Sequence, residues 1–149
     1  MTAAPPLHLL RGFVQWHDRR PGGGEMKTVD EAEGWVRYIA GQGFDEFSTW
    51  TTRRVTRAAE LEGGSVFFVR SGVVLFRMPF LRVEAIAGDS EWAVVMRPAL
   101  IRVEQRRVGM VRGWRYLKDA DAPPDLPAAA EAGDAPPEMA AELRELGLA

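Results

Sequence analysis

The chain has no cysteine and no asparagine, and it has only two histidines, His8 and His17, among 149 residues. Without cysteine it can form no disulfide framework, no thiolate-bound zinc or iron–sulfur cluster and no cysteine nucleophile. Two histidines are too few for a multi-histidine metal centre. The apolar runs are too short to span a bilayer, and the first ten residues lack the pattern of a signal peptide. We therefore expect a cytoplasmic protein with no metal and no cofactor.

Familiar catalytic and nucleotide-binding motifs are also missing. The sequence has no Walker loop, dinucleotide fingerprint, calcium loop or Gly-x-Ser-x-Gly elbow. Both histidines lie in the first segment of the chain, so a histidine base for a nucleophilic triad would have to come from there. Composition and motifs thus narrow the function without naming it.

What the chain does have is an uneven distribution of charge. Its net charge is −2, but residues 50–118 hold 13 basic and 6 acidic side chains, a net +7, whereas residues 119–149 hold 1 basic and 8 acidic, a net −7. A basic segment followed by an acidic tail is typical of a polyanion-binding surface with an internal competitor. A solvated basic face with a solubilising tail explains the same numbers equally well.

The pattern of apolar residues predicts one α+β domain over residues 1–118, with an acidic, Ala- and Pro-rich linker and a short terminal helix over residues 119–149. A capping box formed by Thr28 and Glu31 begins the first expected helix, which ends near Gly41 or Gly43. A second, shorter helix is expected to end at Glu62, before two glycines.

Runs rich in Val, Phe and Leu predict the strands, and Ser71-Gly72 predicts a hairpin turn between two of them. The expected strands span residues 7–14, 65–70, 73–84, 92–97, 100–104 and 107–116. Pro79 interrupts one strand and indicates an edge or a bulge there. Short strands with short breaks favour a small curled antiparallel β-barrel packed with the two helices.

Two clusters combine positive charge with hydroxyl or aromatic side chains. Residues 51–57 include three threonines and three arginines beside an expected helix start, which suits phosphate contact. Residues 112–118 interleave basic residues with Trp114 and Tyr116, a pattern that suits single-stranded nucleic acid. On a strand these two aromatic rings share one face, which fits core packing as well as it fits a stacking platform.

These clusters also mark a resemblance to a known family. The stretches 52–53, 57–61 and 63–69, and later 113–118 and 121–126, resemble the conserved blocks of the bacterial family called domain of unknown function 1489. The resemblance spans about residues 7–126 and leaves the tail outside. A short basic helix, a Gly-Gly turn and a hairpin are more distantly similar to PUA-like domains. That likeness implies a PUA-like barrel and RNA binding, on fold analogy alone.

We therefore predict a nucleic-acid-binding protein, with RNA favoured over DNA. In this prediction the arginines contact phosphate and the threonine hydroxyl forms a hydrogen bond to the nucleic acid. The two aromatic rings stack on bases, and the last two basic residues neutralise phosphate charge. The predicted binding residues are Thr52, Arg53, Arg57, Arg77, Trp114, Arg115, Tyr116 and Lys118. The acidic tail is expected to fold back on the basic segment and weaken non-specific binding.

Two alternatives remain open at this point. The first is a small hydrolase or amidohydrolase in a PUA-like pocket, with Thr52 as nucleophile or orienter, Glu60 as acid/base and Lys118 as electrostatic stabiliser. This reading requires the three groups to converge in one concave pocket. The second is a protein-interaction module that binds partners through its C-terminal helix. The apolar stripe of that helix is Met139, Leu143 and Leu146.

Overall fold

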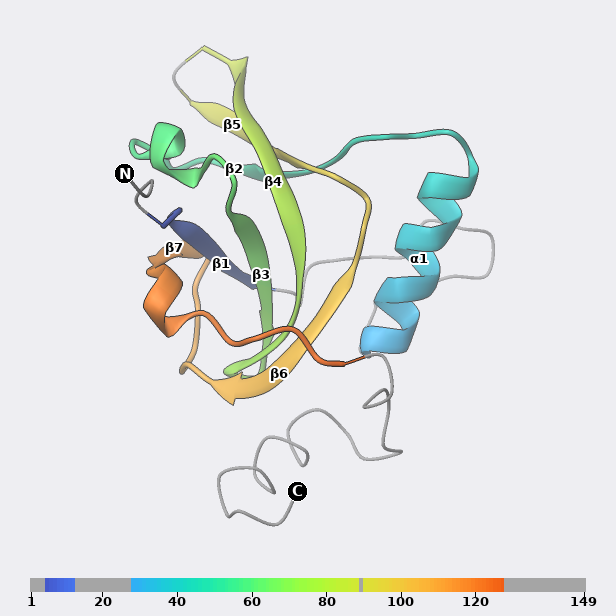
Figure 1. Ribbon diagram of the computed structural model, residues 1–149. Coiled ribbons are helices and arrows are strands. Elements are labelled where there is room, and N and C mark those ends of the chain that lie inside the picture. The colour runs from blue at the N-terminus through green and yellow to red at the C-terminus, as the bar shows by residue number, and fades with distance from the viewer. Residues whose placement is uncertain (1–4, 13–27, 89, 128–149) are drawn as a thin grey trace.

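The computed structural model describes residues 5–12, 28–88 and 90–127, which form a curled seven-stranded sheet with one α-helix beside it (Figure 1). The strands are β1 (His8–Gly12), β2 (Phe47–Thr51), β3 (Ser65–Arg70), β4 (Val73–Ala87), β5 (Glu91–Met96), β6 (Ile101–Arg107) and β7 (Trp114–Leu117). The helix α1 spans Val29–Gly41, and two short 3-10 helices are η1 (Ala58–Leu61) and η2 (Asp119–Asp121). In Figure 1 the two short helices lie at the left of the view and α1 lies at the right, and Leu61 of η1 packs in the same core cluster as most of the buried side chains of α1.

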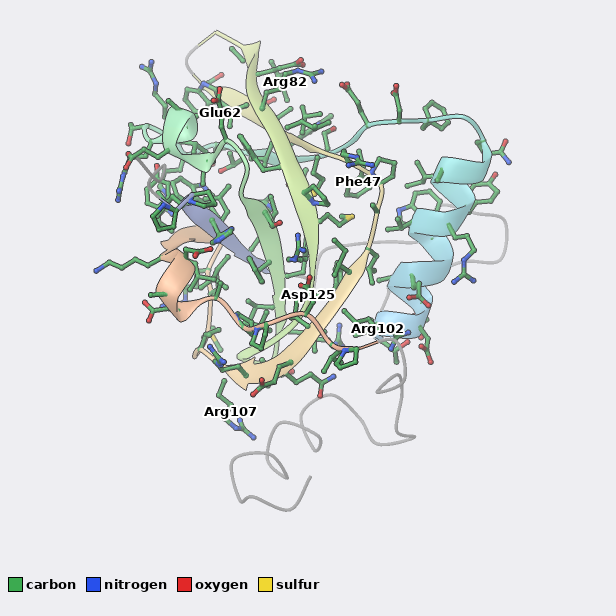
Figure 2. All side chains as sticks on the ribbon, viewed as in Figure 1. Phe47, Glu62, Arg82, Arg102, Arg107 and Asp125 are labelled. Carbon is green, nitrogen blue, oxygen red and sulfur yellow. The ribbon has the colours of Figure 1, made fainter. Side chains whose placement is uncertain are left out.

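The helix α1 begins and packs as its sequence predicts. The Glu31 backbone N–H donates to Thr28 Oγ1 at 3.2 Å, which caps the first turn. Its buried side chains recur at helical spacing, and most of them join the main core of the sheet. They are Val29, Ala32, Val36 and Ile39. Arg102 of β6 bonds the acidic first turn of α1 through Asp30 and Glu33 (Figure 2), so the helix is anchored by ion pairs as well as by apolar packing.

The long strand β4 organises the sheet because it changes its partner along its length. Residues 73–77 pair with β6, and residues 80–87 pair with β5 on the same side. Pro79 lies at the changeover, where its missing N–H costs no ladder bond, and its carbonyl accepts from the backbone N–H of Arg97 at 3.0 Å. The strand order is β2-β5-β4-β3-β1-β7, with β6 attached to β4 off this path.

Strand β1 lies between β3 and β7 and pairs with β3 in parallel. Side chains on its two faces enter two different cores. Leu9 belongs to the large cluster on the α1 side, whereas Leu10 joins Phe67 and Val103 in a smaller cluster on the other face. Because both faces are covered, β3 is buried over nearly its whole length.

The expected barrel with two helices is wrong. The structure is mostly β, with an open mixed sheet in which no backbone ladder joins β2 to β7 within the described residues. The parallel β1–β3 pair also breaks the antiparallel meander that the barrel required. The second expected helix is only the four-residue 3-10 helix η1, which is followed by Glu62, Gly63 at φ +80° and Gly64. A PUA-like barrel is therefore excluded.

One strand was not predicted, and five of the others were placed correctly with shifted ends. The strand expected over residues 107–116 is wrong over most of its length, because β7 begins only at Trp114 and Arg107 belongs to β6. The unpredicted strand is β2, whose sequence Phe-Ser-Thr-Trp-Thr has few apolar residues and buries only Thr49. Residues 124–126 cover the outer edge of β6 through backbone bonds at 2.8 and 2.9 Å. The predicted terminal helix lies outside the described residues.

Candidate nucleic-acid interface

The two ends of the open sheet meet at a seam where side chains replace a backbone ladder. The carbonyl of Trp50 on β2 accepts from the guanidinium of Arg11. The carbonyl of Trp114 on β7 accepts from the guanidinium of Arg53, which lies just after β2. The Trp114 indole N–H donates to Thr51 Oγ1 at 3.0 Å. Carbonyls on both edge strands are thus satisfied by arginines, and the loop after β2 is held against β7.

The arginines of this loop also cover the aromatic rings of β7. The Arg53 guanidinium carbon lies 4.0 Å from the Trp114 ring centroid, and that of Arg57 lies 5.2 Å from the Tyr116 ring centroid. The backbone N–H of Arg57 donates to the Tyr116 hydroxyl at 3.0 Å. Trp114 is 5 % exposed and belongs to the main core. The structure therefore shows Trp114 packed in the core and Tyr116 half-buried beneath an arginine.

Six basic residues surround β7, and we call them the β7 basic group: Arg53, Arg54, Arg57, Arg112, Arg115 and Lys118. Within the described residues, Arg54, Arg112 and Lys118 form no ion pair, and the guanidiniums of Arg53 and Arg115 bond to neutral backbone carbonyls. By contrast, four other arginines of the sheet and helix bond carboxylates. These are Arg37, Arg77, Arg82 and Arg102. The positive charge around β7 is therefore largely uncompensated.

Arg57 is the member of this group that has a carboxylate partner. It bonds Glu60 through two contacts of 2.7 and 2.8 Å. These hydrogen bonds hold the pKa of Glu60 below its ordinary value. A general acid needs a raised pKa, so the shift runs against a role in proton donation. Thr52 is exposed, and neither Thr52 nor Glu60 lines either hollow described below.

Sequence reasoning missed Trp50 as an aromatic at this interface. Its side chain is 65 % exposed, because Thr49 and Thr51 on either side of it turn inward. Its backbone contact to Arg11 fixes it beside β1 at the seam. Strand alternation around a buried Thr49 could have indicated this exposure, had β2 been recognised as a strand.

A polar hollow of about 400 Å³ opens next to β7. Its polar lining comes from four separate segments: His8 on β1, Ser65 on β3, Arg77 on β4, and Asp119 and Asp125 in the chain after β7. His8 is 6 % exposed and Ser65 is 3 % exposed, so both lie at its base. Of the predicted phosphate contacts, Arg77 therefore lies here and not in the β7 basic group.

Hydrogen bonds fix every polar group of this polar hollow. His8 Nδ1 accepts from the Ser65 backbone N–H at 2.9 Å, so its Nε2–H donates to Asp119 Oδ1 at 2.8 Å. The Ser65 hydroxyl contacts Arg77 Nη1 at 2.8 Å and does not contact His8. Serine, histidine and aspartate are therefore close together but are not arranged as a nucleophilic triad.

Asp125 lies in front of the sheet and binds Arg77 with both carboxylate oxygens, at 2.8 and 2.9 Å (Figure 2). This bidentate pair raises the pKa of Arg77 and lowers that of Asp125, the hydrogen bonds being the main cause in both cases. The charge of Arg77 is consequently compensated inside the protein.

A second hollow of about 410 Å³ lies against β7 itself. Leu10 and Leu117 line it together with Arg115, Lys118 and Asp121. It contains Lys118 but neither of the other residues of the hydrolase alternative, so the three groups do not converge in either of these two hollows. Among the described residues no group of three or more histidines or carboxylates is placed to hold a metal ion. The same residues include no helix with the length and apolar character of a membrane span.

The sequence of this chain matches a family model over residues 25–149, and the description of that family is "Protein of unknown function (DUF1489)". The chain belongs to the DUF1489 family. The matched region of this DUF1489 protein includes the acidic tail, which the expected span of residues 7–126 left out. It includes the β7 basic group, whereas β1 with His8 precedes it. No curated protein and no solved structure matches the chain.

Proposed function

We propose that this DUF1489 protein binds single-stranded nucleic acid along β7, with RNA preferred over DNA. The observation that supports this proposal is the positive charge of the β7 basic group beside a strand edge, of which only Arg57 is paired with a carboxylate among the described residues. Phosphate oxygens are acceptors that arginines can contact in pairs, and exposed cations attract a polyanion over long range. A strand edge flanked by such groups offers a linear path for a backbone.

The aromatic contribution comes from Trp50 in this proposal, because the predicted stacking residues are covered by arginines. An exposed indole beside a basic loop provides a face on which an unpaired base can stack. Duplexes keep their bases stacked on each other, so an exposed tryptophan favours single strands. Thr52, exposed next to Arg53, is available as a hydrogen-bond donor to phosphate or sugar.

The scattered positions of Thr52, Glu60 and Lys118 support binding over the hydrolase alternative. Hydrolysis would require these side chains to act on one reacting centre within hydrogen-bond reach. Thr52 is exposed at the loop after β2, Glu60 is occupied by Arg57, and Lys118 lies beyond β7. A binding surface, unlike a catalytic centre, can use groups that are spread along it.

The test is a salt series with the full chain and labelled 12-nucleotide RNA and DNA, each single- and double-stranded. We expect the logarithm of the affinity to fall linearly with the logarithm of salt concentration, because neutralised phosphates release counterions. Single-stranded RNA should bind most tightly. No measurable binding of any of the four ligands at about 50 mM salt contradicts the proposal.

A matched pair of variants locates the site. Arg112→Gln removes an unpaired charge next to β7, and Arg37→Gln removes an exposed charge from α1, which lies away from β7 in Figure 1. We expect Arg112→Gln to reduce the salt slope by about 1, whereas Arg37→Gln leaves the slope unchanged. Equal effects of the two variants would show that binding follows net charge and not this surface.

A further inference from the structure

We propose that the polar hollow holds one base of the bound strand and favours a base with an exocyclic amino group. This inference rests on the proposed function and adds a specificity to it. The polar hollow has a volume of about 400 Å³, within the range of sites that hold small organic molecules. Unpaired bases of RNA are commonly splayed out and recognised by hydrogen bonds to their edges.

The position of the polar hollow suits a base from a strand on β7. Asp119, on its rim, directly follows Lys118 of the β7 basic group. His8, at its base, pairs in register with Leu117, the last residue of β7. A backbone neutralised by Lys118 therefore passes directly beside the opening, and one nucleotide can turn its base inward.

The hydrogen-bonding groups of the polar hollow determine which base edge fits. Its ionised groups are one guanidinium and two carboxylates, because His8 donates from Nε2 and accepts at Nδ1 and so is neutral. Asp119 Oδ1 is used by His8, and no described group donates to Oδ2. The Asp125 oxygens each accept one bond from Arg77 and keep further lone pairs. Free acceptors and net negative charge select N–H donors and disfavour phosphate.

The carboxylates are fixed before any ligand arrives. His8 holds Asp119, and the position of His8 is set in turn by the Ser65 backbone N–H. Arg77 holds Asp125 with two bonds and contacts the buried Ser65 hydroxyl with a third. Because these acceptors are already held in place, they lose little conformational entropy when a base binds. One added hydrogen bond therefore contributes nearly in full to the binding affinity.

Cytosine and uracil differ at position 4, which carries an amino donor in cytosine and a carbonyl acceptor in uracil. They also differ at N3, which is an acceptor in cytosine and an N–H donor in uracil, so the comparison tests whether the carboxylates recognise the amino group and not the uracil N3–H. The experiment measures the affinity of the full chain for rC12 and rU12 across the same salt series. We expect rC12 to bind about five-fold to ten-fold more tightly, which corresponds to about one net hydrogen bond, with equal salt slopes for the two strands. Equal affinities overturn the inference.

The variant Asp119→Asn tests whether the Asp119 carboxylate causes the preference for rC12. It keeps an oxygen that accepts from His8 and replaces the free acceptor with an amide donor, so the preference for rC12 should disappear or reverse toward rU12. Asp121→Asn is the matched control, because it removes the same charge two residues away and outside the polar hollow. We expect the control to keep the preference for rC12.

Each outcome separates the two proposals. If both oligonucleotides bind with a steep salt slope but equally, the inference is wrong and nucleic-acid binding stands. If neither binds, both proposals are wrong. If Asp119→Asn and Asp121→Asn change the preference equally, the effect is one of charge and the polar hollow does not read the base. A thermal unfolding curve for each variant confirms that it is folded at the assay temperature.

Discussion

Gly64 lies where the chain entering β3 passes closest to β1. A Cβ at this position would lie 2.2 Å from the Leu7 carbonyl oxygen and 3.1 Å from His8 Nδ1. Only glycine allows the two backbones to approach this closely, and that approach places the His8 ring against the Ser65 N–H. At the scale of a single residue, the shape of the polar hollow thus depends on a missing side chain.

We expect Gly64→Ala to lower the free energy of unfolding by about 1–3 kcal/mol, the usual cost of forcing atoms into a packed site. Gly41→Ala is the control, because a Cβ added there would meet nothing within 4 Å and Gly41 ends α1. Urea denaturation should show Gly41→Ala within about 0.5 kcal/mol of the parent. Equal midpoints for the two variants would mean that the close approach is unimportant.

The Arg77–Asp125 pair makes the free energy of unfolding depend on pH in the acid range. Because the pKa of Asp125 is lower in the folded protein, the Arg77–Asp125 pair contributes fully to the free energy of unfolding above the unfolded-state pKa of about 4. This contribution is lost as the pH falls through the lower folded-state pKa. We expect Asp125→Asn to reduce the loss of stability below pH about 4, as measured by urea denaturation from neutral pH downward. Parallel curves for the parent and the variant would contradict this assignment.

At the scale of elements, the seam between β2 and β7 depends on side-chain bonds. The Trp114 indole N–H, which is buried, has Thr51 Oγ1 as its acceptor. We expect Thr51→Val to lower the free energy of unfolding by about 1–3 kcal/mol, because a buried donor loses its partner. Thr52→Val changes an exposed threonine next to it and should have little effect. Thermal or urea unfolding of the two variants checks the difference.

The sequence predicted those elements whose pattern is local. The helix α1 has its cap and its buried stripe within 14 residues, and β3 is bounded by Gly64 and the Ser71-Gly72 turn. The seam bonds, by contrast, join residues about 40 to 60 positions apart and decide whether the sheet closes. The local periodicity of the sequence contains no information on such pairings. The sequence pattern therefore predicted a closed barrel, whereas the structure has an open sheet.

The same distinction applies to the candidate site. The basic and aromatic clusters are continuous in sequence and were recognised, but the burial of Trp114 depends on packing against distant core residues. The polar hollow was not predicted, although Arg77, one of its groups, was among the predicted phosphate contacts. Its groups lie at residues 8, 65, 77, 119 and 125, and only the fold brings them together.

At the scale of the whole molecule, the opposite charges of the basic segment and the tail remain the main electrostatic feature. Residues 128–149 contain five acidic side chains and one basic side chain. We expect deletion of these residues to raise the affinity for single-stranded RNA most at low salt, where screening is weakest. The deletion keeps Asp119 and Asp125, which bond the sheet. An unchanged affinity at low salt would contradict competition by the tail.

The same deletion also distinguishes competition with nucleic acid from the alternative role of the tail, which is binding to a protein partner. If the chain acts as an interaction module through Met139, Leu143 and Leu146, this deletion abolishes association with its protein partner. Nucleic-acid binding, on the other hand, should survive the deletion.

The place of β1 between β3 and β7 has a consequence for biosynthesis. β1 leaves the ribosome before both of its partners, because its parallel partner begins at Ser65 and its antiparallel partner begins at Trp114. Both pairings close long loops, which slows folding. Until β7 has been translated, one edge of β1 is unpaired and its apolar side chains lack their final core. We expect nascent chains that stop before β7 to aggregate or to bind a chaperone, since an exposed strand edge is a template for association.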